Sequence, residues 1–544
     1  MTNTLYYGDN LPILRSMPSE CVDLIYLDPP FNSSRSYNVL FKDESGISSD
    51  AQITAFDDTW HWGPSAEQAY LDILQANPGV VDDLLAALRT IIGENQMLAY
   101  LVMMAARLVE LHRVLKTTGS LFLHCDPTAS HYLKIILDTV FGAQNFRNEI
   151  IWLRTSSKSL MTTRFPTNHD SILFYSKTNT YTWNDDTIFQ PYDLGNLNPK
   201  TAEKYALHDS DGRLYQLSDL TNPNPDRPNL TYEFLGITKV WRWTKDRMQA
   251  AYDAGLVIQP RPGAVPRYKR YLDEQRGKPL ADVWTDIPPL NSQAIERLGF
   301  PTQKPITLLE RIIKVSSQTR EVVLDPFCGC GTAIAAAEKL GRQWIGIDIT
   351  YLSINLIENR MKAMFPGIKF EVIGKPEDLG SARNLAQRDR YQFQWWALSL
   401  VGAKPLGGFE LGGAGKKGSD KGIDGVINYI DSAKQELKRV LVQVKSGHVN
   451  AGTVRDLIGV LTNEHAEIGV LITLETPTRD MITAASTAGF YQSQFWQKSY
   501  SRLQILTIEQ ILAGIMVQMP PETGTFITAQ RVKESRGKQQ ELNI

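Results

Sequence analysis

The stretch Asp325-Pro326-Phe327-Cys328-Gly329-Cys330-Gly331-Thr332 separates a predicted strand from a predicted helix. The apolar run 322–324 precedes it, and residues 333–340 have the composition of a helix. A glycine-rich turn between strand and helix lets backbone N–H groups and the helix N-terminus approach a ligand closely. Sixteen residues past Thr332, Asp348 ends a second apolar strand, where nucleotide-binding α/β folds place an acid that accepts from ribose hydroxyls. Taken alone, the turn also fits an α/β protein that binds no ligand there.

Composition sets the outer limits of the interpretation. The chain has 544 residues, too many for one core, so two or three domains are expected. Because the net charge is only −2, any surface that binds nucleic acid has to be local. The four cysteines form neither a secreted disulfide framework nor a zinc motif. With no signal peptide and no apolar run of 18 residues, the sequence predicts a cytoplasmic protein without a membrane partner.

A second motif, Asp28-Pro29-Pro30-Phe31, follows the predicted strand 22–27. Two consecutive prolines end the strand and stiffen the backbone, because each fixes φ and lacks an N–H. Asp28 is therefore held at the carboxyl end of a strand, the edge at which open α/β sheets bind their ligands. For these residues alone, a proline-capped loop without chemistry is an equal alternative.

Together the motifs resemble those of the β-ordered DNA amino-methyltransferases, which act on adenine N6 or cytosine N4. The resemblance implies that the target amine and base are bound by Asp28, Pro29, Pro30 and Phe31. It also implies that S-adenosylmethionine is bound by Asp9, Asn10, Lys304, Pro305, Asp325, Phe327, Gly329, Gly331, Thr332 and Asp348. The aspartate form of the tetrapeptide favours adenine N6, and cytosine N4 is the alternative.

The implied fold is α/β, a permuted Rossmann-like methyltransferase. Its catalytic half would span residues 1–177, an inserted target-recognition region 178–298, and the cofactor-binding half 299–375. The chemistry of the reaction supports this assignment. The lone pair of a base amine is delocalised into the ring, and acceptors at Asp28 and the Pro29 carbonyl could localise it on the nitrogen. The target atom is hidden in duplex DNA, so the partner is expected to be double-stranded DNA with a flipped base.

For other polar residues of the catalytic half, the sequence gives weaker evidence of a functional role. His124 and Asp126 follow a predicted strand, and a structural or substrate-lining role is favoured because methyl transfer needs no acid–base pair. The loop 155–169 and its border carry Arg154, Lys158 and Arg164, which are candidates for contact with the DNA backbone.

The inserted region is locally basic. Between Arg227 and Pro279 there are eleven Lys or Arg residues against five Asp or Glu, interleaved with aromatic residues. This composition suits phosphate contact combined with base reading. Trp241-Arg242-Trp243 is the first candidate for a contact strand. A solvated face with a few core aromatics is the alternative.

A second α/β domain is predicted over residues 391–515, after a polar linker at 376–390 and before a polar tail at 516–544. Asp424 precedes one predicted strand of a hairpin, and Gln443 and Lys445 face the same side of the other. Carboxylate and amide oxygens can hold Mg²⁺, and a lysine can orient the attacking water.

This constellation resembles the Mrr-like branch of the PD-(D/E)xK restriction endonucleases, with Gln443 in place of an acid. The resemblance implies a Mg²⁺-dependent endonuclease in which Asp424 and Gln443 hold the metal and Lys445 is catalytic. One departure is that many relatives carry a glutamate on the first helix, whereas residues 393–401 contain none. The prediction is thus a restriction-modification enzyme in one chain. The alternatives are a C-terminal domain that binds DNA without cutting it, and methylation of RNA or protein. The oligomeric state stays open, with a dimer among the options.

Overall fold

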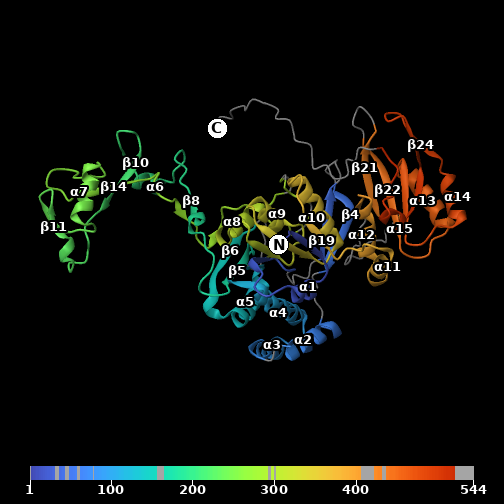
Figure 1. The fold of residues 1–544 in the computed structure, drawn as a ribbon, viewed down its shortest axis with the longest axis horizontal. Coiled ribbons are helices and arrows are strands. Elements are labelled where there is room, and N and C mark those ends of the chain that lie inside the picture. Colours follow the sequence, from blue (N-terminus) through green and yellow to red (C-terminus); the bar gives the residue numbers. More distant parts are fainter. Residues whose placement is uncertain are drawn as a thin grey trace. The chain divides into compact units, whose positions relative to one another are not determined.

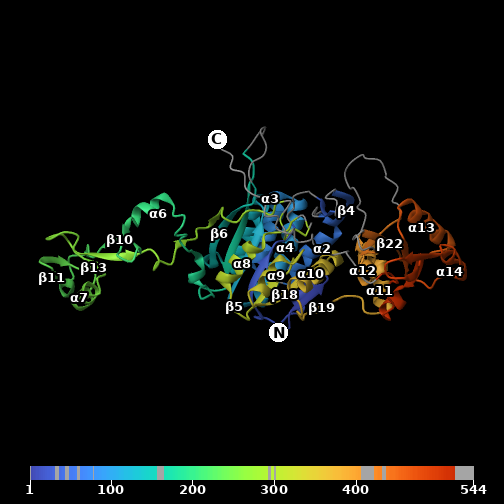
Figure 2. The same cartoon turned by 90° about the horizontal axis from the view of Figure 1, so that it is seen from above.

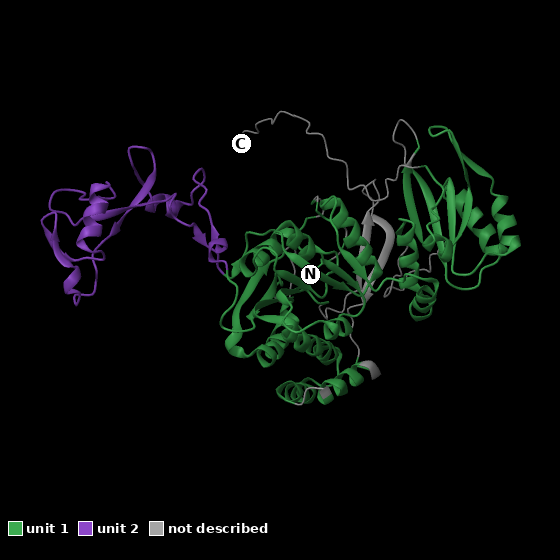
Figure 3. Cartoon of the chain, viewed as in Figure 1, with its two compact units in different colours: residues 1–183, 282–544 green, residues 184–281 purple. Residues whose placement is uncertain are grey.

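The computed structural model describes residues 2–30, 36–42, 48–57, 62–76, 79–155, 165–291, 294, 296–298, 300, 302–405, 422–431 and 437–520. The chain forms two compact units, residues 1–183 with 282–544, and residues 184–281 (Figure 3). The second unit falls inside the predicted insert. In the described part of the chain, no helix is both long and apolar enough to cross a membrane.

The first unit contains a nine-stranded sheet with the order β16-β6-β7-β5-β2-β17-β18-β1-β19. All neighbouring strands pair in parallel except β7, which is antiparallel to both β5 and β6. The strands are β1 (Thr4–Tyr7), β2 (Val22–Leu27), β5 (Leu115–Cys125), β6 (Phe146–Leu153), β7 (His169–Ser176), β16 (Val283–Trp284), β17 (Val322–Asp325), β18 (Gln343–Asp348) and β19 (Glu371–Ile373). A separate hairpin pairs β3 (Ser36–Lys42) with β4 (Ser48–Asp57).

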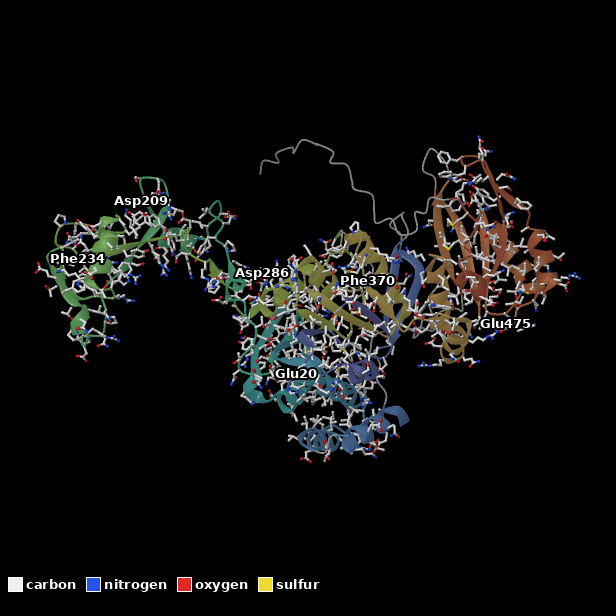
Figure 4. The ribbon with its side chains drawn as sticks, viewed as in Figure 1. Glu20, Asp209, Phe234, Asp286, Phe370 and Glu475 are labelled. Carbon is white, nitrogen blue, oxygen red and sulfur yellow. The ribbon has the colours of Figure 1, made fainter. Side chains whose placement is uncertain are left out.

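Helices cover both faces of this sheet, and each face has its own apolar core (Figure 1). One face is covered by α1 (Asn10–Ser16), α4 (Gln96–Val114) and α5 (Pro127–Phe141), with α2 (Pro64–Ala76) and α3 (Val80–Ile92) packed outside them. The other face is covered by α8 (Ile306–Ser316), α9 (Thr332–Lys339) and α10 (Tyr351–Met364). There Phe370, labelled in Figure 4, packs on Trp344 with ring centroids 5.5 Å apart. The predicted α/β fold is confirmed.

Strand β17 lies between β2 and β18, although β2 is far earlier in the sequence. Leu324 pairs with Ile25 in parallel register, so the two motifs that follow these strands emerge at one edge of the sheet. The acid that follows β2 and the glycine turn that follows β17 are far apart in the sequence, in the predicted order, yet they lie together at this edge of the sheet.

The second unit has small sheets around its own core. Its elements are β8 (Phe189–Gln190), α6 (Pro199–Lys204), β9 (Leu207–His208), β10 (Leu214–Asp219), β11 (Thr231–Phe234), β12 (Ile237–Val240), α7 (Lys245–Asp253), β13 (Val257–Ile258), β14 (Arg267–Tyr271) and β15 (Lys278–Pro279). The core gathers Leu220, Phe234, Trp241, Met248 and Val257. In the same unit, Asp209 (Figure 4) accepts from Lys269 at 3.0 Å.

Trp241 has no exposed surface, and its indole N–H donates to the Tyr232 carbonyl at 2.9 Å. The prediction that Trp241 contacts DNA is therefore wrong, because its ring completes the apolar core of the unit. Trp243 is half-buried beneath the guanidinium of Arg247, 4.4 Å from the ring centroid. Only Arg242 of the three predicted contact residues is exposed.

The C-terminal domain is a five-stranded sheet with helices on both faces (Figure 2). Its strands are β20 (Lys404–Pro405), β21 (Gly425–Ile430), β22 (Leu437–Lys445), β23 (Ile468–Thr473) and β26 (Leu503–Thr507), in that order. One face packs against α11 (Leu379–Arg388), α12 (Arg390–Leu400) and α15 (Ile508–Leu512), and the other against α13 (Ala451–Asn463) and α14 (Arg479–Ser486). A short hairpin joins β24 (Phe490–Ser493) to β25 (Lys498–Ser501).

The predicted linker 376–390 is wrong, because most of it is the helix α11. Asp378 caps this helix by accepting from Ser381 N at 2.7 Å, and Ala382 is fully buried in the core of the C-terminal domain. Arg383 also pairs with Glu475 (Figure 4) at 3.7 Å. A polar composition here reflects one exposed helix face, which sequence alone did not separate from a linker. Of the predicted tail, residues 521–544 lie outside the described residues.

Candidate functional site

Asp28 follows β2 directly, and its carboxylate meets the ammonium of Lys304. The Lys304 Nζ lies 2.6 Å from Asp28 Oδ2, and the two side chains are only 11% and 16% exposed. Lys304 was predicted to bind the cofactor, yet in this structure it pairs with the predicted catalytic acid. Pro305 then precedes α8 as its N-cap residue, and Phe31 lies outside the described residues.

The glycine turn after β17 has the backbone that only glycine adopts easily. Gly329 and Gly331 have φ of +49° and +73°, in the left-handed region. A Cβ on Gly331 would lie 2.8 Å from Ile357, so a side chain there would clash. The Thr332 hydroxyl accepts from the buried guanidinium of Arg360 at 3.1 Å, so it is turned into the protein. Arg360 closes the turn by donating also to the Cys330 carbonyl at 2.9 Å.

Cys328 and Cys330 are buried among apolar side chains, so they pack within the protein. Phe327, which was predicted to contact the cofactor, is partly buried against the core on the α1, α4 and α5 side.

Asp348 is fixed between the glycine turn and the start of α10. Its Oδ2 accepts from Gly329 N at 2.8 Å, and its Oδ1 accepts from the Thr350 N and Oγ1 at 2.9 and 2.8 Å. Burial raises the pKa of Asp348, and these hydrogen bonds oppose the rise. The carboxylate is therefore oriented before any ligand arrives.

Asp325 is 4% exposed and accepts from Phe327 N at 3.1 Å. Burial raises its pKa well above the ordinary value of 3.8; the charges of Asp28 and Asp348 add to the rise, and Lys304 opposes it. Three carboxyl groups thus share one edge of the sheet with one ammonium. Such an edge favours a ligand that carries positive charge.

Of the predicted cofactor residues Asp9 and Asn10, Asn10 contacts the glycine turn, and Asp9 caps the helix on which Asn10 lies. Asp9 caps α1 by accepting from Leu11 N at 3.0 Å, and the Asn10 amide donates to the Pro326 carbonyl at 2.7 Å. Arg107 from α4 donates to both side chains, at 2.7 Å from Asp9 Oδ1. Arg107 was not among the predicted site residues, although it is the one charged residue in the otherwise apolar stretch 97–109, which is a signal that the sequence contains.

His124 and Asp126 are engaged within the protein, which agrees with a structural role. His124 is fully buried between the Tyr26 hydroxyl at 3.0 Å and Asp170 Oδ2 at 3.1 Å. Against the effect of burial, the bond to His124 lowers the pKa of Asp170. Asp126 is the N-cap of α5 and accepts from Thr128 N and Ala129 N. Arg154 lies 3.1 Å from Asp170 Oδ1, whereas Lys158 and Arg164 fall outside the described residues.

In the C-terminal domain, the antiparallel pairing of β21 with β22 brings Asp424 and Gln443 together. Asp424 Oδ2 accepts from Val444 N at 2.6 Å, and its Oδ1 accepts from the Gln394 amide at 2.8 Å. The Gln443 amide donates to the Gly422 carbonyl at 2.6 Å. Its Oε1 is buried and has no hydrogen-bond partner among the described residues. Gln394, which the sequence analysis missed, comes from α12.

These residues fit a Mg²⁺ ion poorly. Within the described ranges, no group of three or more His, Cys, Asp or Glu side chains converges on one point. Among the described residues the site supplies one carboxylate, that of Asp424, and both of its oxygens accept from N–H donors. Gln394, on α12, and Gln443 carry amides rather than carboxylates, and Mg²⁺ is usually held through carboxylates.

Several curated proteins are similar to this chain. Type II methyltransferase M.EcaI of Enterobacter cloacae is 30% identical over 266 residues, which are 48% of this chain and 57% of that protein. The Mod subunit of the type III restriction-modification enzyme StyLTI of Salmonella typhimurium is 25% identical, over 63% of this chain and 50% of that protein. DNA adenine methyltransferase YhdJ of Escherichia coli K12 is 24% identical, over 65% of this chain and 81% of that protein. The chain spans about half the length of the first two relatives.

Two family models match separate parts of the chain. Residues 408–513 match the NACHT-associated inactive restriction endonuclease 1 family. This match agrees with a restriction-endonuclease-like domain, whereas the Mrr-like assignment and the cleavage activity stay predictions. Residues 22–359, more than half of the chain, match the N6_N4_Mtase model. Together with the strand order and the two motifs at one sheet edge, this match shows that the chain belongs to the N6_N4_Mtase family of DNA methylases.

Proposed function

We propose that the protein transfers a methyl group from S-adenosylmethionine to N6 of adenine in duplex DNA. The observation that carries this proposal is the convergence of Asp28, Asp325 and Asp348 at one edge of the sheet, with Asp28 held by Lys304 at 2.6 Å. A cationic cofactor suits the negative charge of this edge, and a base amine suits the acceptors at Asp28.

S-adenosylmethionine supplies an electrophilic methyl group on a sulfonium when it is bound. Asp348, which protein hydrogen bonds hold in place, would accept from ribose hydroxyls, and the left-handed turn at Gly329 and Gly331 would let the backbone come close to the ligand. Asp325, whose carboxyl is desolvated, lies where it can face the positive part of the cofactor. These are the residues that we expect to hold it.

The carboxylate of Asp28 and the carbonyl of Pro29 would accept hydrogen bonds from the target amine. This contact would localise the nitrogen lone pair for attack on the sulfonium methyl group. The new N–C bond would replace the C–S bond, the sulfur would leave as a neutral thioether, and the proton lost from the amine would pass to solvent. Lys304 holds the carboxylate in place for this contact. The base has to leave the helix to reach Asp28, and Phe31 is the proposed stacking surface.

Adenine is the proposed target because position 28 is an aspartate, and the similarity to the adenine methyltransferase YhdJ agrees with it. Cytosine N4 is the alternative. Analysis of nucleosides from methylated DNA distinguishes the two bases directly.

The test is transfer of labelled methyl groups to duplex DNA by Asp28→Ala, Asp28→Asn and Lys445→Ala. Asp28→Ala should lower the rate by about 100-fold or more, because a preorganised polar contact at the reacting atom is lost. Asp28→Asn keeps one acceptor oxygen and should retain part of the rate. Lys445→Ala should behave like the unmodified protein, and undiminished transfer by Asp28→Ala would overturn the assignment.

For the C-terminal domain, we propose binding of DNA without cleavage. The single carboxylate, the amides at Gln394 and Gln443, and the match to an inactive endonuclease family support this. Mg²⁺-dependent cleavage is the second candidate, favoured by the unpartnered Oε1 of Gln443. Incubation of unmethylated DNA with Mg²⁺ decides between them. Cleavage that disappears in Lys445→Ala would establish the nuclease, and its absence together with Lys445-dependent retention of DNA would support the binding domain.

A further inference from the structure

One helix of the C-terminal domain touches the methyltransferase directly at the start of α10. The Oε1 of Gln392, on α12, accepts from Tyr351 N at 2.8 Å. Tyr351 is the first residue of α10, and it lies three positions past Asp348. The contact therefore joins the C-terminal domain to the turn that orients the acid proposed to bind the cofactor ribose.

The first N–H groups of a helix have no partner within the helix, so another group has to satisfy them. At α10 this role is divided between the two domains. Thr350, the N-cap, accepts from Ser353 N at 3.2 Å, while Gln392 satisfies Tyr351. Thr350 also donates two hydrogen bonds to Asp348. If the first turn of α10 became more mobile, the Asp348 carboxylate would consequently be held less firmly in its orientation.

A second contact from α12 reaches the glycine turn. Trp395 packs against the cluster of Phe300, Cys330 and Leu352. Phe300 lies over the turn, because a Cβ on Gly329 would be 3.2 Å from its ring. Cys330 belongs to the turn itself. Trp395 thus packs on the cluster that includes the turn residue Cys330, and it lies one helical turn from Gln392 on the same helix.

The side chain of Tyr351 adds a further contact between α10 and the C-terminal domain. Its ring is fully buried in the core of the C-terminal domain and meets the ring of Tyr7 edge to face, with centroids 4.9 Å apart. Tyr7 in turn pairs with Asp348 in the parallel register of β1 and β18. The start of α10 is therefore shared between the two domains through its backbone and its first side chain.

We propose that the C-terminal domain completes the cofactor site, with Gln392 and Trp395 as positioning residues for S-adenosylmethionine. The proposal rests on the assignment of Asp348 and the glycine turn to the cofactor. It gives the C-terminal domain a function in methyl transfer that is independent of any action on DNA.

The test is the affinity of the full chain for S-adenosylhomocysteine, measured by titration calorimetry. Gln392→Leu keeps the volume and removes the acceptor, so it should weaken binding about fivefold, the usual net worth of one hydrogen bond. Gln392→Glu keeps an acceptor oxygen and should restore the affinity. Trp395→Leu should weaken binding through the Phe300 cluster. The matched control is Gln387→Leu, a glutamine exposed on α11, which should bind like the unmodified protein.

Kinetics separate positioning from general damage. In Gln392→Leu the KM for S-adenosylmethionine should rise, while kcat at saturating cofactor is retained. An affinity in Gln392→Leu and Trp395→Leu within twofold of the unmodified protein would overturn the proposal, as would a failure of Gln392→Glu to restore binding. If the unmodified chain itself does not bind S-adenosylhomocysteine, the proposed methyltransferase function fails instead, so the two failures are distinguishable.

Discussion

Asp28 and Asp424 both stand at the end of a strand, yet their partners are of different kinds. Asp28 meets an ammonium, Lys304, and has two further carboxyl groups near it. Among the described residues, Asp424 accepts from two uncharged donors, the Gln394 amide and the Val444 backbone N–H. The first arrangement places three carboxyl groups beside one ammonium, whereas in the second a single described carboxylate accepts from two uncharged N–H donors. The position of an acid on a sheet thus predicts where a site lies, and its partners decide the chemistry.

The largest expected effect comes from breaking the Lys304–Asp28 pair. Lys304→Met leaves a mostly buried carboxylate without its cation, which should lower kcat for methyl transfer roughly tenfold to hundredfold. Lys304→Arg keeps the charge and should recover part of the rate, though its planar guanidinium fits a site shaped for an ammonium less well. The measurement is steady-state transfer at several cofactor concentrations. A raised KM for S-adenosylmethionine at unchanged kcat would instead return Lys304 to the cofactor role predicted from its motif.

A smaller effect, on Mg²⁺ affinity, is expected when carboxylates are added beside Asp424. The double variant Gln394→Glu with Gln443→Glu raises the number of carboxylates from one to three, and Mg²⁺ affinity depends on ligand charge. Calorimetric titration of Mg²⁺ should show binding about tenfold tighter, or more, than in the unmodified chain. The isosteric change Gln387→Glu on α11 is the control for added surface charge. Equal affinity in all three proteins would mean that ligand charge is not what limits metal binding there.

The smallest effect concerns the pH dependence of stability. The pKa of Asp325 is raised above 3.8 by burial, so the folded state binds a proton that the unfolded state releases. The stabilisation is fully present below the unfolded pKa and is lost as the pH rises through the folded pKa. Asp325→Asn removes this dependence, so its Tm relative to the unmodified protein should increase as the pH rises from 4 towards 8. One kcal/mol corresponds to about 2–4 °C for a domain of this size.

Thermal unfolding across that pH range, without cofactor, checks the prediction. Asp348→Asn serves as a comparison, because its carboxyl has a raised pKa but accepts three hydrogen bonds that an amide cannot all replace. A Tm difference for Asp325→Asn that does not change with pH would contradict the desolvated state of Asp325.

Features set by short stretches of chain could be predicted from the sequence. The turn at Gly329 and Gly331 needs left-handed backbone, the prolines after Asp28 end a strand, and the apolar runs before both motifs are buried strands. The predicted helix over 393–401 and the hairpin around Asp424 are also present, as α12 and the β21–β22 pair. Each depends on local conformational preference and hydrophobic periodicity, which residues near in sequence carry.

The partners of the polar groups were decided only by the tertiary structure. Lys304 reaches Asp28 across 276 positions, Arg107 reaches Asn10 across 97, and Gln392 reaches Tyr351 across 41. The burial of Trp241 also depends on the tertiary structure. A basic, aromatic-rich stretch of sequence does not show which of its aromatic residues enter the core. A hydrogen bond or ion pair over such separations depends on how distant helices and strands pack, and that packing follows from the burial of whole faces. The sequence by itself determined where the two sites lie, and the packing determined which charges and donors each acid meets.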